Sequence, residues 1–127
     1  GNVKLPPNIL KKSQEYISKK FNLPHNTIDF VFHGGSGSSV EEIREAIGYG
    51  VIKMNIDTDM QYAFMSGVRE YFNEKSEYLK AQMGPPDGEA LPNKKYYDPR
   101  KWIREGENSF VHRLEKAFED LNNVNTL

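Results

Sequence analysis

Residues 30–38 read FVFHGGSGS, and residues 51–59 read VIKMNIDTD. Each stretch begins as an apolar strand and ends in polar groups, which are His33 and a glycine- and serine-rich loop in the first and Asn55 and Asp57 in the second. In parallel α/β barrels the ligand-binding side chains lie at the carboxyl ends of the strands. The pattern therefore predicts an α/β fold with two consecutive strand–helix units of such a barrel. The 127 residues are too few to close one, because a complete barrel needs roughly 200 or more.

The other predicted elements follow from hydrophobic spacing and from capping residues. They are a helix over residues 8–21 with Asn8 as its N-cap, a strand over 28–32, a helix that opens at the capping box Ser39–Glu42 and stops at 48–50, a strand over 51–56, a helix from Thr58 and a helix from Pro99 behind the cap Asp98. The mostly apolar first strand is typical of a strand covered on both faces. Gly106 is expected to interrupt the last helix.

Side-chain spacing also predicts which faces are buried. In the helix after residue 58 the inward residues are expected to be Tyr62, Met65, Val68 and Phe72, and in the last helix Phe110, Val111, Leu114, Phe118 and Leu121. Residues 84–93, GPPDGEALPN, suit neither a helix nor a strand. A loop of this length is more often functional or docked than idle.

Composition excludes several classes of protein. The formal net charge of −1 argues against non-specific nucleic-acid binding, which needs an excess of Lys and Arg. No apolar run approaches the roughly 20 residues of a membrane span, and the first residues do not read as a signal peptide. The absence of cysteine rules out disulfides and thiolate chemistry. A cytoplasmic protein without nucleic-acid or membrane partners is expected.

The chemistry of the first polar stretch allows two interpretations. A neutral imidazole at a strand end is a good zinc ligand, and the glycine loop and the helix after it offer N–H groups to a phosphate. Alternatively, the loop is only a flexible turn and His33 a hydrogen-bonded loop residue. A zinc site needs at least two further ligands. Neither His25, in a loop, nor His112, on the polar side of the last helix, is expected to supply one.

Three stretches in register resemble one enzyme family. Residues 30–38 (FVFHGGSGS), 53–59 (KMNIDTD) and 93–100 (NKKYYDPR) are similar to the class II, zinc-dependent fructose-1,6-bisphosphate aldolases, and the likeness covers the whole chain. It implies a (β/α)8 TIM barrel, of which this chain would be the C-terminal third. Residues 1–83 would hold the seventh and eighth strand–helix units and the helix before them. Residues 84–127 would form a helical C-terminal extension involved in dimer and phosphate contacts.

The resemblance implies a role for individual residues. His33 is similar to a zinc ligand. Gly34 and Ser36 resemble a loop that binds one substrate phosphate and a monovalent cation, K⁺ or Na⁺. Asn55 and Asp57 would be catalytic, with Asn55 contacting the dihydroxyacetone-phosphate portion and Asp57 positioning substrate hydroxyls. The resemblance also implies three phosphate contacts, Thr58, Arg100 and, more weakly, Lys94. Arg100 would reach into the neighbouring subunit of a homodimer.

The implied reaction is reversible aldol cleavage of fructose 1,6-bisphosphate to dihydroxyacetone phosphate and glyceraldehyde 3-phosphate. Zn²⁺ would polarise the ketone, so Lys53 is not needed for a Schiff base. The family's other zinc histidines, its catalytic aspartate and its enolisation glutamate have no counterpart here, so the chain is expected to be inactive alone and to dock against an N-terminal portion. Two alternatives stay open: a tagatose-bisphosphate aldolase, or a non-catalytic sugar-phosphate-binding fragment.

Overall fold

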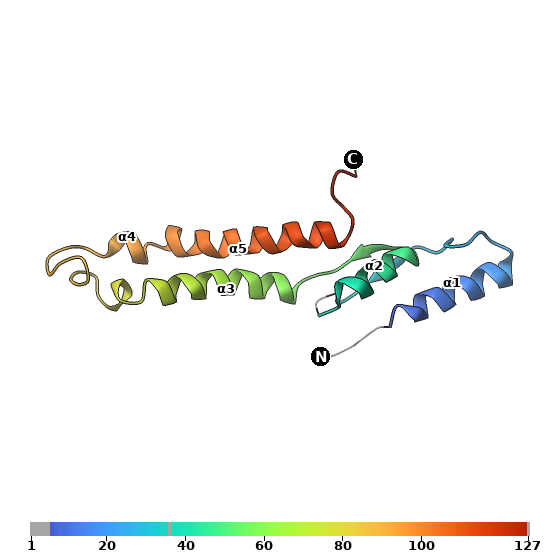
Figure 1. The fold of residues 1–127 in the computed structure, drawn as a ribbon, viewed down its shortest axis with the longest axis horizontal. Helices are drawn as coiled ribbons and strands as arrows, with labels where there is room; N and C mark the ends of the chain where they lie inside the picture. Colours follow the sequence, from blue (N-terminus) through green and yellow to red (C-terminus); the bar gives the residue numbers. More distant parts are fainter. Residues whose placement is uncertain (1–5, 36, 127) are drawn as a thin grey trace. The chain divides into compact units, whose positions relative to one another are not determined.

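A computed structural model describes residues 6–35 and 37–126. Its elements are α1 (Asn8–Phe21), β1 (Phe30–Phe32), α2 (Val40–Gly48), β2 (Val51–Met54), α3 (Thr58–Glu74), a 3₁₀ turn η1 (Tyr78–Lys80), α4 (Lys94–Tyr97) and α5 (Pro99–Asp120) (Figure 1). The described part is thus mostly helical, with two parallel strands. None of its helices is long and apolar enough to cross a lipid bilayer.

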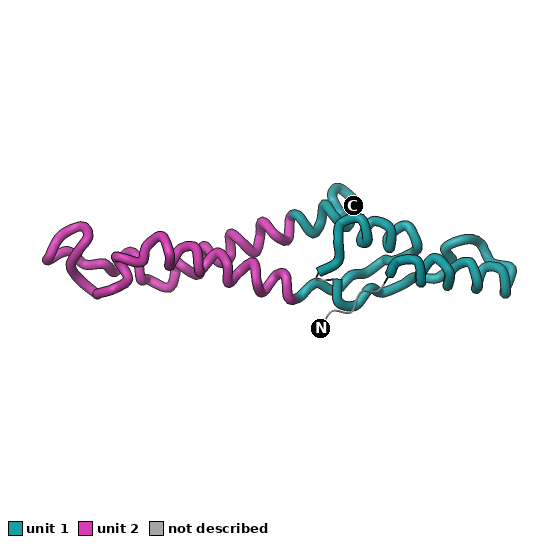
Figure 2. Tube along the Cα trace, turned by 60° about the horizontal axis from the view of Figure 1, so that its bottom comes forward, with its two compact units in different colours: residues 1–57, 116–127 teal, residues 58–115 magenta. Residues whose placement is uncertain are grey.

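The chain divides into two compact units, coloured separately in Figure 2. Unit 1 comprises residues 1–57 and 116–127, and unit 2 comprises residues 58–115. The boundary expected near residue 83 concerns the barrel and its extension, and it stays a prediction.

Unit 1 is built around the strand pair. β1 and β2 pair in parallel, with Phe30 opposite Val51 and Phe32 opposite Met54. Phe32, Val51 and Ala46 of α2 form the buried core, which Leu10 of α1 borders. The strands are not fully covered within the described chain, because Val31 of β1 is 45% and Ile52 of β2 is 69% exposed. The prediction that the first strand is covered on both faces is therefore wrong for this chain, because its described helices leave Val31 exposed.

A buried amide joins α1 to the rest of unit 1. Gln14 is fully buried. Its Nε2 donates to the carbonyl oxygens of Ile28 (2.6 Å) and Tyr49 (3.0 Å), and its Oε1 accepts from the Ile28 N–H (3.2 Å). The side chain therefore satisfies backbone groups just before β1 and just before β2, groups that would be costly to bury unpaired.

The predicted capping signal is present at α2 but not at α1. The capping box of α2 is present, since Ser39 Oγ accepts from Glu42 N (3.2 Å) and the Glu42 carboxylate accepts from Ser39 N (2.8 Å). α1 has the predicted bounds, but Asn8 is its first helical residue and Pro7 occupies the N-cap position without a side-chain bond. The Asn8 cap was therefore wrong.

Unit 2 pairs α3 with α5, which lie side by side in both views (Figures 1 and 2). A Cβ added to Gly67 of α3 would lie 2.8 Å from Ser109 Cβ, and one added to Gly106 of α5 would lie 2.8 Å from the Phe64 ring. These glycines let the helices approach closely. The predicted interruption at Gly106 was wrong, because α5 continues through it and uses its small size for packing.

Several predicted inward faces were also wrong. Tyr62, Met65 and Phe72 are 58%, 43% and 42% exposed, whereas Met60 and Gly67 are buried. In α5 the exposed residues include Val111 and Phe118, and the buried ones include Ala117 and Asp120. Hydrophobic spacing predicted the helices correctly, but it did not predict which side of each helix packs within this chain.

Candidate active site at the strand ends

His33 and Asn55 come together at the carboxyl ends of the two strands. Asn55 N donates to the carbonyl oxygen of Phe32 (3.0 Å), and Gly35 N donates to that of Asn55 (3.0 Å), so the parallel pairing extends beyond the strands. This register places the Asn55 amide Nδ2 2.9 Å from His33 Nδ1. Because an amide NH2 can only donate, Asn55 Nδ2 donates to His33 Nδ1, and this contact orients the imidazole ring.

The glycine loop begins beside this pair. Gly34 has φ 75°, which glycine adopts without the penalty of other residues. Gly35 is buried, and a Cβ there would meet the Met54 side chain and lie 3.4 Å from the carbonyl oxygen of Asn55. A side chain at Gly35 would therefore require the Met54 side chain to shift, a contact that sequence reasoning missed. The role predicted for Ser36 lies outside the described residues.

The remaining predicted residues fall in two places. Asp57 lies three residues after the end of β2, in unit 1, and is exposed. Thr58 is the exposed first residue of α3. Lys94 begins α4 and Arg100 is the second residue of α5, both in unit 2 and both exposed. The structure therefore brings His33 and Asn55 into contact, and the predicted roles of the other four stay predictions.

Arg100 is held by the carboxylate that caps its helix. Asp98 Oδ1 accepts hydrogen bonds from Arg100 N and from Arg100 Nε, each at 3.0 Å. Hydrogen bonds from the Arg100 side chain, and next from its backbone N–H, hold the pKa of Asp98 well below its usual range. The predicted cap is confirmed, and it also orients the guanidinium.

A second ion pair links α3 to α5 within unit 2. Arg113 Nη2 lies 3.0 Å from Asp59 Oδ2, and both side chains are only partly exposed. Asp59 is the acidic residue in the first turn of α3, and its partner Arg113 is a contact that the sequence did not predict. The signal was absent from the sequence, since 54 positions separate the two residues.

Among the described residues, only His33 is a candidate metal ligand. His33 offers an exposed imidazole at a strand end, which fits a zinc ligand. Within residues 6–35 and 37–126 no three His, Cys, Asp or Glu side chains gather to hold a metal. His25 and His112 are exposed, as expected. Of the residues that the structure describes, His33 therefore fits a single metal ligand and not a complete site.

The sequence profile described as "Fructose-bisphosphate aldolase class-II" matches residues 1–126. The chain belongs to the class II fructose-bisphosphate aldolase family. It is 58% identical over 127 residues to the "Fructose-bisphosphate aldolase class 2" of Escherichia coli K12, and 61% identical to the fructose-bisphosphate aldolase of Haemophilus influenzae. Each match covers 100% of this chain and 35% of the relative.

A solved aldolase shares the fold of the chain. The crystal structure of fructose-bisphosphate aldolase from Campylobacter jejuni matches with a TM-score of 0.91 and 58% identity, over 100% of this chain and 37% of that one. The family assignment and the fold of this part are thereby established. The chain spans about a third of the length of the aldolases that it matches.

Proposed function

We propose that the chain is the C-terminal portion of an enzyme that cleaves fructose 1,6-bisphosphate reversibly to dihydroxyacetone phosphate and glyceraldehyde 3-phosphate. The observation that carries the proposal is the 2.9 Å contact between His33 and Asn55. It joins a metal-ligand type and a substrate-binding type at adjacent ends of parallel strands, which is where α/β barrels carry their active sites. The two strands would be the seventh and eighth of a (β/α)8 barrel.

The residues of unit 1 would bind the reacting end of the sugar. His33 would hold Zn²⁺ together with ligands from the N-terminal portion. When bound there, Zn²⁺ polarises the substrate ketone as a Lewis acid. Gly34, with Ser36, would bind a substrate phosphate and a monovalent cation. The Asn55 amide would orient the three-carbon portion that becomes dihydroxyacetone phosphate, and the Asp57 carboxylate would accept hydrogen bonds from substrate hydroxyls.

The residues of unit 2 would bind phosphate. Thr58 opens α3, and its hydroxyl would add a phosphate contact near the positive end of that helix. The Arg100 guanidinium would bind the distal phosphate across the interface of a homodimer, since its planar fork matches phosphate oxygens. Lys94 would support that phosphate more weakly, as a point charge.

The proposal is tested by the chemistry that forms the carbon–carbon bond. The complete enzyme should lose turnover on treatment with a zinc chelator and regain it with Zn²⁺. Borohydride added with substrate should leave it active, because no lysine forms a Schiff base. His33→Ala should remove zinc and activity together, whereas the control Lys53→Met should keep both.

Two further results would decide against the proposal. Borohydride inactivation, or faster cleavage of tagatose 1,6-bisphosphate than of the fructose substrate, would contradict the mechanism or the substrate. Turnover by the isolated 127-residue chain would contradict its dependence on an N-terminal portion.

A further inference from the structure

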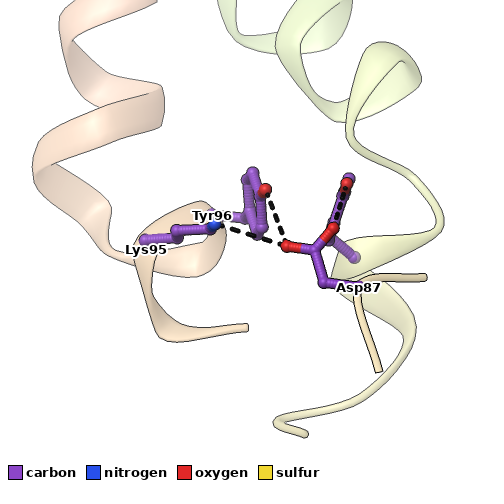
Figure 3. A network of polar contacts seen from close by, with 4 residues as sticks. Asp87, Lys95 and Tyr96 are labelled. Carbon is purple, nitrogen blue, oxygen red and sulfur yellow. Dashed lines mark hydrogen bonds and ion pairs between the residues drawn. The ribbon is translucent and has the colours of Figure 1, made fainter. Parts of the chain in front are cut away.

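The Asp87 carboxylate connects three side chains from the segments around it (Figure 3). Tyr78 Oη of η1 donates to Asp87 Oδ1 over 2.8 Å. Lys95 Nζ and Tyr96 Oη of α4 each donate a hydrogen bond to Asp87 Oδ2 at a distance of 3.3 Å. The rings of Tyr78 and Tyr96 are stacked with their centroids 3.7 Å apart. One carboxylate in the loop thus ties η1 to α4; these four residues are called the Asp87 cluster below.

Electrostatics within the Asp87 cluster agree with its geometry. The hydrogen bond from Tyr78, followed by contacts of Lys95, lowers the pKa of Asp87, so the carboxylate stays charged. Hydrogen bonding with Tyr96, followed by donation to Asp87, raises the pKa of Tyr78, so its hydroxyl keeps its proton. At neutral pH the Asp87 carboxylate is therefore charged and the Tyr78 hydroxyl keeps its proton.

The same loop and helix are fastened at two other points. Asn93 is fully buried; its Nδ2 donates to the carbonyl oxygen of Ala81 (3.1 Å), and its N–H donates to that of Gln82 (2.9 Å). Tyr71 Oη of α3 donates to the carbonyl oxygen of Tyr96 over 2.8 Å. The loop is thus closed at its base, α4 is held against α3, and the Asp87 cluster fixes the remaining side.

Of the two cations that we propose to bind phosphate, Lys94 lies in this fastened segment and Arg100 follows shortly after it. Lys94 immediately precedes Lys95, and its carbonyl oxygen accepts the N–H of Asp98 (3.0 Å). Asp98 in turn holds Arg100. Both cations are exposed, so no apolar packing of their own fixes them. A phosphate that binds cations already in place avoids the cost of ordering them.

We propose that Asp87 is a positioning residue for phosphate binding, because through Lys95 and Tyr96 it sets the place of Lys94 and Arg100. The inference rests on the proposed function, in which these two cations bind the distal phosphate of the sugar bisphosphate. Asp87 touches neither cation directly, so its effect must pass through α4 and the Asp98 cap.

The test uses Asp87→Asn in the complete enzyme. Asn retains an acceptor for Tyr78 but replaces the second oxygen, which accepts from Lys95 and Tyr96, by an amide that donates. We expect the KM for fructose 1,6-bisphosphate to rise about tenfold with kcat little changed, as when binding alone is weakened. The affinity for dihydroxyacetone phosphate, which has no distal phosphate, should stay as in the wild type.

Two controls separate positioning from general damage. Glu77→Gln removes an exposed ion pair to Lys80 that lies outside the Asp87 cluster, and it should leave KM unchanged. In an Arg100→Ala background, Asp87→Asn should add little further increase, since the main cation it positions is gone. A fully additive increase, a wild-type KM in the single variant, or equal loss of dihydroxyacetone phosphate binding would overturn the inference. Failure of the proposed function would instead show as absent turnover in the wild type.

Discussion

Asp98 serves two structural purposes with one side chain. It supplies the acceptor that caps the first turn of α5, and it holds the guanidinium of Arg100. A carboxylate that accepts charge-assisted hydrogen bonds is stabilised in its ionised form, which is why its pKa is lowered. A phosphate approaching Arg100 must therefore share the guanidinium with Asp98.

The lowered pKa of Asp98 gives stability a defined pH dependence. A carboxyl whose pKa is lower in the folded than in the unfolded state stabilises fully above the unfolded pKa, about 4, and loses this effect as pH falls through the folded pKa. Asp98→Asn keeps a capping oxygen but no charge. Thermal unfolding of the complete enzyme should show a wild-type advantage at pH 6–7 that shrinks below about pH 4. An advantage that stays constant down to pH 3 would contradict the assignment.

At the scale of elements, the junction between α2 and β2 has almost no free space. Gly50 has φ 95°, and a Cβ there would lie 2.7 Å from the carbonyl oxygen of Ile28 and 2.6 Å from Gln14 Nε2. By contrast, a Cβ on Gly48, the last residue of α2, would meet no atom within 4 Å. There is therefore space for a side chain at Gly48 but not at Gly50, although only one residue separates them.

This difference predicts opposite results for one substitution. Gly50→Ala should lower the free energy of unfolding by about 2 kcal/mol or more, since it adds overpacking against backbone to a left-handed conformation. Gly48→Ala should be neutral or stabilising by up to about 1 kcal/mol, because alanine favours the helix. Denaturant unfolding of both variants of the complete enzyme measures the contrast. Equal stability of the two variants would show that the junction adapts.

The sequence predicted elements better than contacts, for physical reasons visible in particular residues. Capping by Ser39 and Asp98 is local, so it could be predicted, and so could the meeting of His33 and Asn55 from strand pairing. Burial of Gln14 could not, because its partners are backbone groups up to 35 positions away. The Asp87 cluster likewise depends on how a loop without regular structure closes. The barrel and the roles of the phosphate-binding residues stay predictions.

At the scale of the whole molecule, both strands carry an apolar side chain that the described chain does not cover, Val31 in β1 and Ile52 in β2. Two strands rarely form a stable sheet by themselves in water. The described chain also leaves large apolar side chains exposed on its helices, among them Ile9 at 51% and Phe21 at 61%. These surfaces agree with a chain that spans about a third of its relatives and whose partner we propose to be an N-terminal portion.

A charge at Ile52 should therefore damage assembly. Ile52→Glu in the complete enzyme should lower the free energy of unfolding by about 2 kcal/mol or more. Burial of an isoleucine side chain stabilises a fold by about 1.5–3 kcal/mol, and a buried carboxylate adds a desolvation penalty. The control Lys12→Glu changes an exposed residue of α1 and should leave the melting temperature within about 1–2 °C. Equal melting temperatures for wild type and Ile52→Glu would mean that this position stays in water.

The three bonds of Gln14 also determine how α1 can come loose. Its amide holds both the N–H and the carbonyl of Ile28, so α1 cannot move away without releasing the chain that leads into β1. Loss of the helix and exposure of that N–H to solvent are thus one event. The rate of hydrogen exchange at the Ile28 N–H should therefore report how readily α1 detaches from unit 1.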